Sequence, residues 1–320
     1  MIKKNINSIF NGINISDNLG FDNEFMSYYK LLSNEKPFDS LINFFEFLQS
    51  RIEIVNEKVL DIGCGFGIHS IILSGYNNDV IGIDAADHRI TEGQKFLSLI
   101  NRNLYKVNII KGPAYPLPFD NNTFDLVYCN EFVSHVYGLH NMLKESYRVL
   151  KDNGRILVLD CDRRNLFSLK QLYFDLPKMY DNFFLERRKD LLKKAGELYK
   201  IDLSDNWINI IAKKTEGWYK LELTELVRQY GNGIKNTDSL LSIYKPKFKY
   251  RCPDTGQYEE RLFTRREMLK IVKECGFKAQ IIRLSDIPLL PLKFIKFLIY
   301  KLYGINDIKY LVVGNKVNKT

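Results

Sequence analysis

The residues best suited to chemistry gather in one short stretch, where an apolar run meets three alternating glycines. That stretch reads Val59-Leu60-Asp61-Ile62-Gly63-Cys64-Gly65-Phe66-Gly67. Glycines after a strand permit a tight turn and let the backbone approach a ligand without an intervening Cβ atom. The helix that follows offers free N–H groups at its start. The pattern predicts a ligand-binding loop, although a purely structural turn has the same pattern.

Two acidic residues narrow the kind of ligand. Asp61 stands in the run before the loop, and Asp84 closes the next apolar run, about 20 residues further on. A carboxylate at the second position can accept hydrogen bonds from ribose hydroxyls. Single residues separate the glycines, whereas pyrophosphate-binding loops have two residues before the last glycine. We therefore expect a nucleoside cofactor that lacks a pyrophosphate.

The surrounding elements must place these residues at one edge of a sheet. Strands are predicted at 59–62, 79–84, 107–111, 124–129, 154–160, 278–284 and 310–317, with helices from 69, over 87–100 and over 264–275. Thr264 and Glu267 form a capping box for the last helix. This alternation predicts an α/β fold: a doubly wound, Rossmann-like, mostly parallel seven-stranded sheet with helices on both faces.

Four regions follow from the same pattern. Residues 1–55 are expected to form a helical N-terminal cap and 56–162 the cofactor-binding core. Residues 163–262, rich in Tyr, Phe, Lys and Arg, interrupt the rhythm and are expected to form an inserted substrate or lid region. Residues 263–320 would complete the sheet.

Several ordered motifs resemble the class I S-adenosylmethionine-dependent methyltransferases, in particular the subgroup with the ubiquinone and menaquinone biosynthesis enzymes. The likeness covers roughly residues 56–162 and returns at 263–318. It rests on the glycine stretch, on Gly82-Ile83-Asp84, on Leu117-Pro118-Phe119-Asp120-Asn121-Asn122-Thr123-Phe124-Asp125-Leu126-Val127, and on Arg148-Val149-Leu150-Lys151-Asp152-Asn153-Gly154-Arg155-Ile156-Leu157. The resemblance implies S-adenosylmethionine as cofactor. No metal site is expected, because the five cysteines are far apart and the chain has only four histidines.

The resemblance also implies the cofactor contacts. Around the methionine part it places Asp61, Gly63, Cys64, Gly65 and Gly67, with Asn130 and Glu131 facing the methionine end and the acceptor; at the ribose it places Asp84 and Ala85. Near the adenine, where the family often has an acidic residue beside an alanine, this chain has Pro113 and Ala114. Proline has neither a carboxylate nor an N–H, so the Ala114 backbone or another side chain must make the adenine contact.

One histidine is a candidate catalytic base. His135 follows the fourth predicted strand, and a neutral imidazole can take a proton from an acceptor near pH 7. The alternative is that His135 simply packs or makes a hydrogen bond in the helix. For Cys64 and His69, we favour packing over chemistry.

Composition limits the cellular setting. The five cysteines form no CxxC pair, and residues 1–20 lack an apolar signal-peptide core, so we expect free thiols and a cytoplasmic protein. The net charge of +9 comes from lysines scattered along the chain, which favours a solvated basic surface. The segment Pro288–Tyr303 is apolar with three lysines, so it is a candidate for peripheral contact with an anionic membrane or for packing at the sheet edge.

The acceptor is expected to be a small or lipid-linked molecule, methylated on an O, N or C atom. Cys129-Asn130-Glu131-Phe132 stands where enzymes that methylate exocyclic base amines carry an Asn/Asp-Pro-Pro-aromatic sequence, which disfavours nucleic-acid bases. The alternatives are a catalytically inactive methyltransferase-like scaffold and an RNA methyltransferase.

Overall fold

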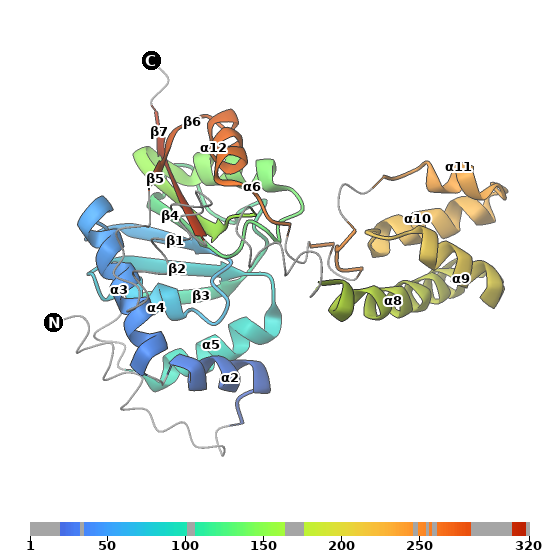
Figure 1. Cartoon of the computed structure of the whole chain (residues 1–320), viewed down its shortest axis with the longest axis horizontal. Coiled ribbons are helices and arrows are strands. Elements are labelled where there is room, and N and C mark those ends of the chain that lie inside the picture. Colours follow the sequence, from blue (N-terminus) through green and yellow to red (C-terminus); the bar gives the residue numbers. More distant parts are fainter. Residues whose placement is uncertain are drawn as a thin grey trace, which may run out of the picture. The chain divides into compact units, whose positions relative to one another are not determined.

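The structure, a computed structural model, describes residues 20–32, 35–100, 106–163, 176–245, 249–253, 256–257, 261–282 and 309–317. The chain divides into two compact units, which are described one by one (Figure 1). The first unit comprises Met1–Val133, Gly138–Asp162 and Thr264–Thr320. The second comprises Arg163–Phe263 together with the short segment Ser134–Tyr137.

A seven-stranded sheet is the frame of the first unit in its described part. Its strands are β1 (Lys58–Ile62), β2 (Asp79–Asp84), β3 (Val107–Lys111), β4 (Phe124–Asn130), β5 (Leu150–Cys161), β6 (Phe277–Ile282) and β7 (Lys309–Lys316). Their order is β3-β2-β1-β4-β5-β7-β6, with β1 to β5 parallel and β7 antiparallel to both neighbours. The predicted α/β fold with a mostly parallel sheet is confirmed.

Helices cover both faces of this sheet. They are α2 (Asn23–Leu32), α3 (Glu35–Ile52), α4 (Ile68–Ser74), α5 (Asp87–Leu99), α6 (Leu139–Val149) and α12 (Arg265–Glu274) (Figure 1). The first four share one hydrophobic core with the strands, and this core includes Phe45, Phe96 and Leu311. Val272 of α12 packs against Gly314 instead, and residues 311 and 314 point to opposite faces of β7.

The register brings the ends of the central strands together. In the parallel ladders Asp61 pairs with Gly82 on one side and with Tyr128 on the other. The loops that follow β1, β2 and β4 therefore leave from the same edge of the sheet. In doubly wound folds this carboxyl edge, beside the point where the strand order reverses, is where ligands bind.

The second unit is a helical bundle. Its described helices are α8 (Leu176–Tyr199), α9 (Asp205–Lys214), α10 (Lys220–Gly231) and α11 (Thr237–Leu241). They enclose a separate hydrophobic cluster that includes Ile211, Trp218, Leu226 and Leu240. The unit has its own core, so it can hold its shape without help from the sheet.

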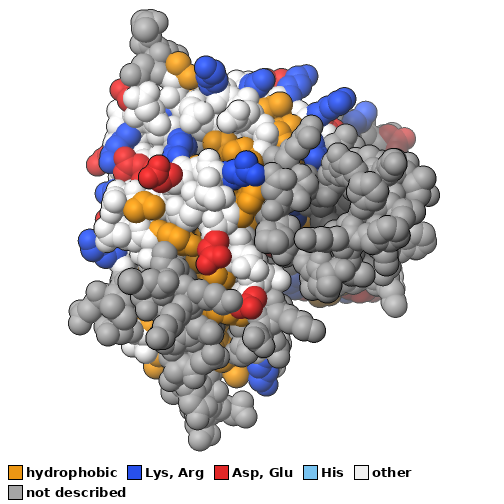
Figure 2. All heavy atoms as spheres, turned by 60° about the vertical axis from the view of Figure 1, so that its left-hand side comes forward, with side chains coloured by type: hydrophobic (Ala, Val, Ile, Leu, Met, Phe, Trp, Pro, Cys, Tyr) orange, Lys and Arg blue, Asp and Glu red, His pale blue; other side chains and the backbone are white. Residues whose placement is uncertain are grey.

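Charged residues of both signs are interspersed on the visible part of the face in Figure 2, among apolar and uncharged side chains. That distribution agrees with a solvated basic surface. Among the described residues, no helix is both long and apolar enough to cross a membrane. The segment Pro288–Tyr303 lies outside the described residues.

Candidate active site

The glycine loop joins β1 to α4 in a conformation that side chains resist. Gly63 has φ 77° and Gly65 has φ 55°, both in the left-handed region. A Cβ atom on Gly63 would lie 2.3 Å from the ring of Phe132, the residue that follows Glu131 after β4. A Cβ atom on Gly65 would meet nothing within 4 Å. The loop is thus packed underneath at Gly63 and open at Gly65.

Asp84 ties this loop to the end of β2. Its Oδ2 accepts a hydrogen bond from the Gly65 N–H at 3.0 Å, and its Oδ1 accepts one from the Ala86 N–H at 2.8 Å. The carbonyl of Ile83 accepts from the Gly63 N–H at 2.8 Å. A carboxylate has about four acceptor sites, so Asp84 can still accept from other donors. Ala85, beside it, is exposed.

Asp61, in the strand before the loop, is a buried carboxyl with a raised pKa. Its side chain is 2 % exposed, and its Oδ2 accepts a hydrogen bond from Ser70 Oγ at 2.6 Å. Burial raises the pKa of Asp61 to about 7, the charge of Asp84 adds to the rise, and the Ser70 hydrogen bond opposes it. A cation held near Asp61 would favour its ionised form.

Cys64, in the middle of the loop, is a packing residue. Its sulfur lies where a Cβ atom on Gly82 would come within 2.8 Å of it, so loop and strand are in close contact. Burial raises the pKa of the Cys64 thiol well above its usual value, and the charges of Asp61 and Asp84 add to the rise. The reactive species of a cysteine is the thiolate, so Cys64 is unsuited to act as a nucleophile at neutral pH.

The end of β4 presents two polar side chains at the same edge. The Asn130 Oδ1 atom is buried and has no hydrogen-bond partner among the described residues. Glu131 has φ 48°, which is rare for a residue other than glycine, and its N–H donates to the Leu159 carbonyl at 2.8 Å. Its exposed carboxylate pairs with Lys309 Nζ at 2.5 Å. Lys309 begins β7, and sequence reasoning missed it because it belongs to no motif.

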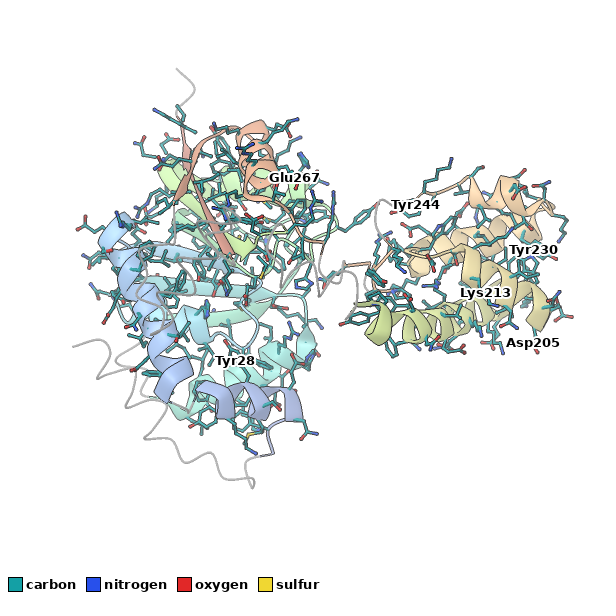
Figure 3. All side chains as sticks on the ribbon, in the orientation of Figure 1. Tyr28, Asp205, Lys213, Tyr230, Tyr244 and Glu267 are labelled. Atoms are coloured by element: carbon teal, nitrogen blue, oxygen red, sulfur yellow. The ribbon has the colours of Figure 1, made fainter. Side chains whose placement is uncertain are left out.

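Tyr28 of α2 is a second residue that sequence reasoning missed. Its ring lies 6.0 Å from that of Phe66 in the glycine loop (Figure 3). Burial raises the pKa of Tyr28 to about 12, and the negative charges of Glu131 and Asp61 add to the rise. The phenol therefore stays protonated at neutral pH and can donate a hydrogen bond at this edge. No motif indicated Tyr28; the sequence predicted only a helical N-terminal cap over residues 1–55.

His69 is held by packing, as the sequence suggested. Its Nδ1 lies 3.1 Å from the Tyr128 hydroxyl, and its ring meets Phe45 edge-on at 5.3 Å between centroids. Burial lowers the pKa of His69 to about 4, and the positive charge of Lys309 contributes. The imidazole is neutral at pH 7 and has two structural partners.

An ion pair on α6 holds the segment 117–119, which follows β3. Arg148 and Glu145 are joined at 2.8 Å, and Arg148 donates to the Leu117 and Phe119 carbonyls at 3.1 and 2.8 Å. This explains why the Leu117-Pro118-Phe119 and Arg148 motifs occur together. Upstream, Pro113 is exposed and Ala114 half-buried.

Most of the predicted site residues thus meet at the carboxyl edge of the sheet in the first unit: Asp61, Gly63, Cys64, Gly65, Gly67, Asp84, Ala85, Pro113, Ala114, Asn130 and Glu131. His135 is different, because it belongs to the second unit. Its catalytic role stays a prediction.

The edge is chemically suited to a cationic nucleoside. It offers the acidic side chains of Asp61 and Asp84, an open position at Gly65, and an amide oxygen on Asn130 to which no group in the described part of the chain donates. S-Adenosylmethionine carries ribose hydroxyls, an ammonium group and a sulfonium, and each of these groups favours such acceptors and anions.

Comparison with known proteins also indicates a methyltransferase. A family model described as a methyltransferase domain matches residues 60–158. The chain is 28% identical to the demethylmenaquinone methyltransferase of Geobacillus kaustophilus over 214 residues, 64% of this chain and 86% of that enzyme. It is 28% identical to the sterol 24-C-methyltransferase of Kluyveromyces lactis over 165 residues, 47% of this chain and 43% of that enzyme.

A solved structure of an S-adenosylmethionine-dependent methyltransferase from Aquifex aeolicus is similar at a TM-score of 0.45 and 12% identity, covering 85% of this chain and 89% of that one. The domain match spans the glycine loop, Asp84 and the end of β4, which are the parts of the edge described above. The chain is therefore an S-adenosylmethionine-dependent methyltransferase with a methyltransferase domain over residues 60–158, and it is similar to the demethylmenaquinone methyltransferases.

Proposed function

We propose that this enzyme methylates a small or lipid-linked acceptor at an O, N or C atom, and that the edge around Asp84 and the glycine loop binds the cofactor. The observation that carries the site is the 3.0 Å hydrogen bond between the Gly65 N–H and Asp84 Oδ2. This bond supports the proposal because it holds the Asp84 carboxylate, which can accept hydrogen bonds from ribose hydroxyls, beside the open position at Gly65. Relatives named for demethylmenaquinone and for a sterol support a lipid-like acceptor.

In this proposal Asp84 and Ala85 hold the ribose, with both hydroxyls donating to the free acceptor sites of the Asp84 carboxylate. Ala114, through its backbone, and Pro113, through its ring, contact the adenine. The exposed ring of Pro113 offers an apolar surface, and Ala114 retains the N–H that Pro113 lacks.

The methionine end falls to residues from β1 and β4. Asn130 Oδ1, buried and without a donor, accepts a hydrogen bond from the ammonium group, and Glu131 adds a negative charge nearby. Asp61, whose pKa of about 7 reflects a poorly solvated carboxylate, becomes ionised when positive charge arrives. The cofactor supplies an electrophilic methyl group on its sulfonium.

Methyl transfer is an in-line displacement, so the protein's task is to align the acceptor and to exclude water. We assign the removal of an acceptor proton to His135, which is half-buried in the second unit. The proposed acceptor-binding region consists of the inserted region 163–262, which lies in the second unit, together with residues 1–55. Peripheral membrane contact through 288–303 would suit a lipid-linked acceptor.

Calorimetric titration with S-adenosylhomocysteine tests the cofactor site. We expect micromolar binding by the wild type and a loss of about 100-fold or more in Asp84→Ala, because hydrogen bonds to a charged group contribute about 1.5–3 kcal/mol each. Asp79→Asn is the matched control: Asp79 is an exposed carboxylate at the opposite end of β2. Equal affinity of Asp84→Ala and wild type would refute the site.

The same titration separates the alternatives. An inactive scaffold would bind no S-adenosylhomocysteine. An RNA methyltransferase would bind it and would also bind RNA with an affinity that falls steeply as salt rises. Cofactor binding without RNA binding supports the small-acceptor proposal.

A further inference from the structure

The loop after β4 leaves the first unit, and four of its residues belong to the second unit. Residues 134–137 lie in sequence between Val133 and Gly138, which are both part of the first unit, yet the four residues belong to the second. The Arg261 N–H donates to the Ser134 carbonyl at 2.9 Å, and Ser134 is 1% exposed. Four residues have no core of their own, so contacts such as this one tie them to the second unit.

Arg251 makes several contacts within the second unit. Its side chain is 1% exposed, and its Nη1 donates to both carboxylate oxygens of Glu222, at 2.8 and 2.9 Å. Its Nε donates to the Gly256 carbonyl at 2.7 Å, and Nη1 also lies 2.9 Å from the Tyr244 hydroxyl. A buried cation persists only when it is paired and hydrogen-bonded, so the guanidinium is fixed in place.

Tyrosine rings enclose the guanidinium, and one of them comes from the loop. Arg251 Cζ lies 3.8 Å from the ring centroid of Tyr137 and 4.3 Å from that of Tyr219. The Tyr137 hydroxyl lies 3.3 Å from that of Tyr244, which Figure 3 labels on the second unit. Tyr137 is 42% exposed, so what holds it is this cage rather than a hydrophobic core.

We propose that Arg251 is a positioning residue that clamps the 134–137 loop to the acceptor-binding unit and thereby fixes the orientation of His135. This inference rests on the proposed function. His135 precedes Tyr137 by two residues, so a fixed Tyr137 ring limits the backbone angles that the loop can adopt. The second unit then holds the loop that carries His135, in addition to binding the acceptor.

Amide hydrogen exchange of the full chain tests the clamp without knowledge of the acceptor. Tyr137→Ala removes the ring over Arg251, whereas Tyr137→Phe keeps the ring and removes only the hydroxyl contact. Arg251→Lys keeps the charge but loses the planar, bidentate geometry. We expect exchange in a peptide covering 134–137 to rise about five- to tenfold in Tyr137→Ala and Arg251→Lys, and to stay near wild type in Tyr137→Phe.

Exchange in α9, at the far part of the same bundle, separates positioning from general stability. A clamp predicts unchanged exchange in Asp205–Lys214, whereas a role in folding the whole unit predicts a rise there too. An unchanged 134–137 peptide in Tyr137→Ala, or an equal rise in α9, would overturn the proposal. Because exchange needs no ligand, this result stands even if titration with S-adenosylhomocysteine refutes the proposed function.

A kinetic comparison then tests the effect on catalysis, with S-adenosylmethionine and reduced demethylmenaquinone as the probe acceptor. We expect Tyr137→Ala to lower kcat at least tenfold with the KM for S-adenosylmethionine unchanged, and Tyr137→Phe to restore kcat. A rise in the KM for S-adenosylmethionine with kcat unchanged would contradict the positioning role. Absence of turnover by the wild type would reject this acceptor and leave the exchange result to decide the clamp.

Discussion

Replacing Asp61 by asparagine should make the protein more stable at pH 8, although Asp61 is buried in the centre of the site. The carboxyl has a pKa of about 7 in the folded chain against 3.8 as the reference value. One pKa unit corresponds to about 1.36 kcal/mol, so keeping the ionised form buried costs about 4 kcal/mol. Asparagine has nearly the same shape, its oxygen can accept from Ser70 Oγ, and it carries no charge.

The pH window follows from the direction of the shift. Below pH 4 the carboxyl is protonated in both the folded and the unfolded chain, and it adds no pH-dependent term. As the pH rises from 4 to 7, the unfolded chain ionises first, so the free energy of unfolding falls. Above pH 7 the loss is complete. Asp61→Asn should therefore match the wild type near pH 4 and exceed it by up to about 4 kcal/mol at pH 8.

Urea unfolding of both proteins at pH 5, 6, 7 and 8 measures this difference. Far-UV circular dichroism is the suitable signal, because both tryptophans, Trp207 and Trp218, lie in the second unit and do not report on the sheet. Asp79→Asn, at an exposed position, controls for the general loss of a negative charge. If wild type and Asp61→Asn lose the same free energy of unfolding between pH 5 and 8, the raised pKa assigned to Asp61 is wrong.

Other substitutions probe the packing around the site. Gly63→Ala should cost at least about 3 kcal/mol, since it combines a positive φ with overlap on Phe132, and thermal unfolding should show it. Gly65→Ala should cost about 1–2 kcal/mol but weaken S-adenosylhomocysteine binding by more than that, because its Cβ projects into open space; equal affinity would contradict this. Thr264→Ala should cost about 1 kcal/mol in urea unfolding, because Thr264 Oγ1 accepts from the Glu267 N–H at 3.2 Å; an unchanged midpoint would argue against the cap.

The sequence predicted the strands well because period and composition are local properties. The predicted runs at 79–84 and 107–111 coincide with β2 and β3, and the capping box at Thr264 is confirmed. The fifth strand was predicted from residue 154 but begins at Leu150. Lys151, Asp152 and Asn153 are polar, so an apolar pattern misses them, while pairing of Phe124 with Leu150 extends the ladder through tertiary contact.

Contacts between distant parts of the chain were not predictable from spacing. Lys309 reaches Glu131 only because β7 runs antiparallel beside β5, which places Lys309 opposite Cys161 at the carboxyl edge. Tyr28 reaches the glycine loop because α2 packs on the core through Phe25. Both residues depend on tertiary packing that no motif in this chain encodes.

The carboxyl edge can also be located from energetics alone, without any motif. Asp61 is a buried carboxylate with a raised pKa, Asn130 has a buried oxygen that receives no hydrogen bond from the described residues, and Glu131 has a positive φ. Each feature is unfavourable in the free protein, and strain of this kind persists where a ligand or reaction uses it. A positively charged ligand would relieve the first by favouring ionisation of Asp61 and the second by donating to Asn130. The first two features therefore favour a positively charged ligand that donates hydrogen bonds, and all three occur at the same edge of the sheet.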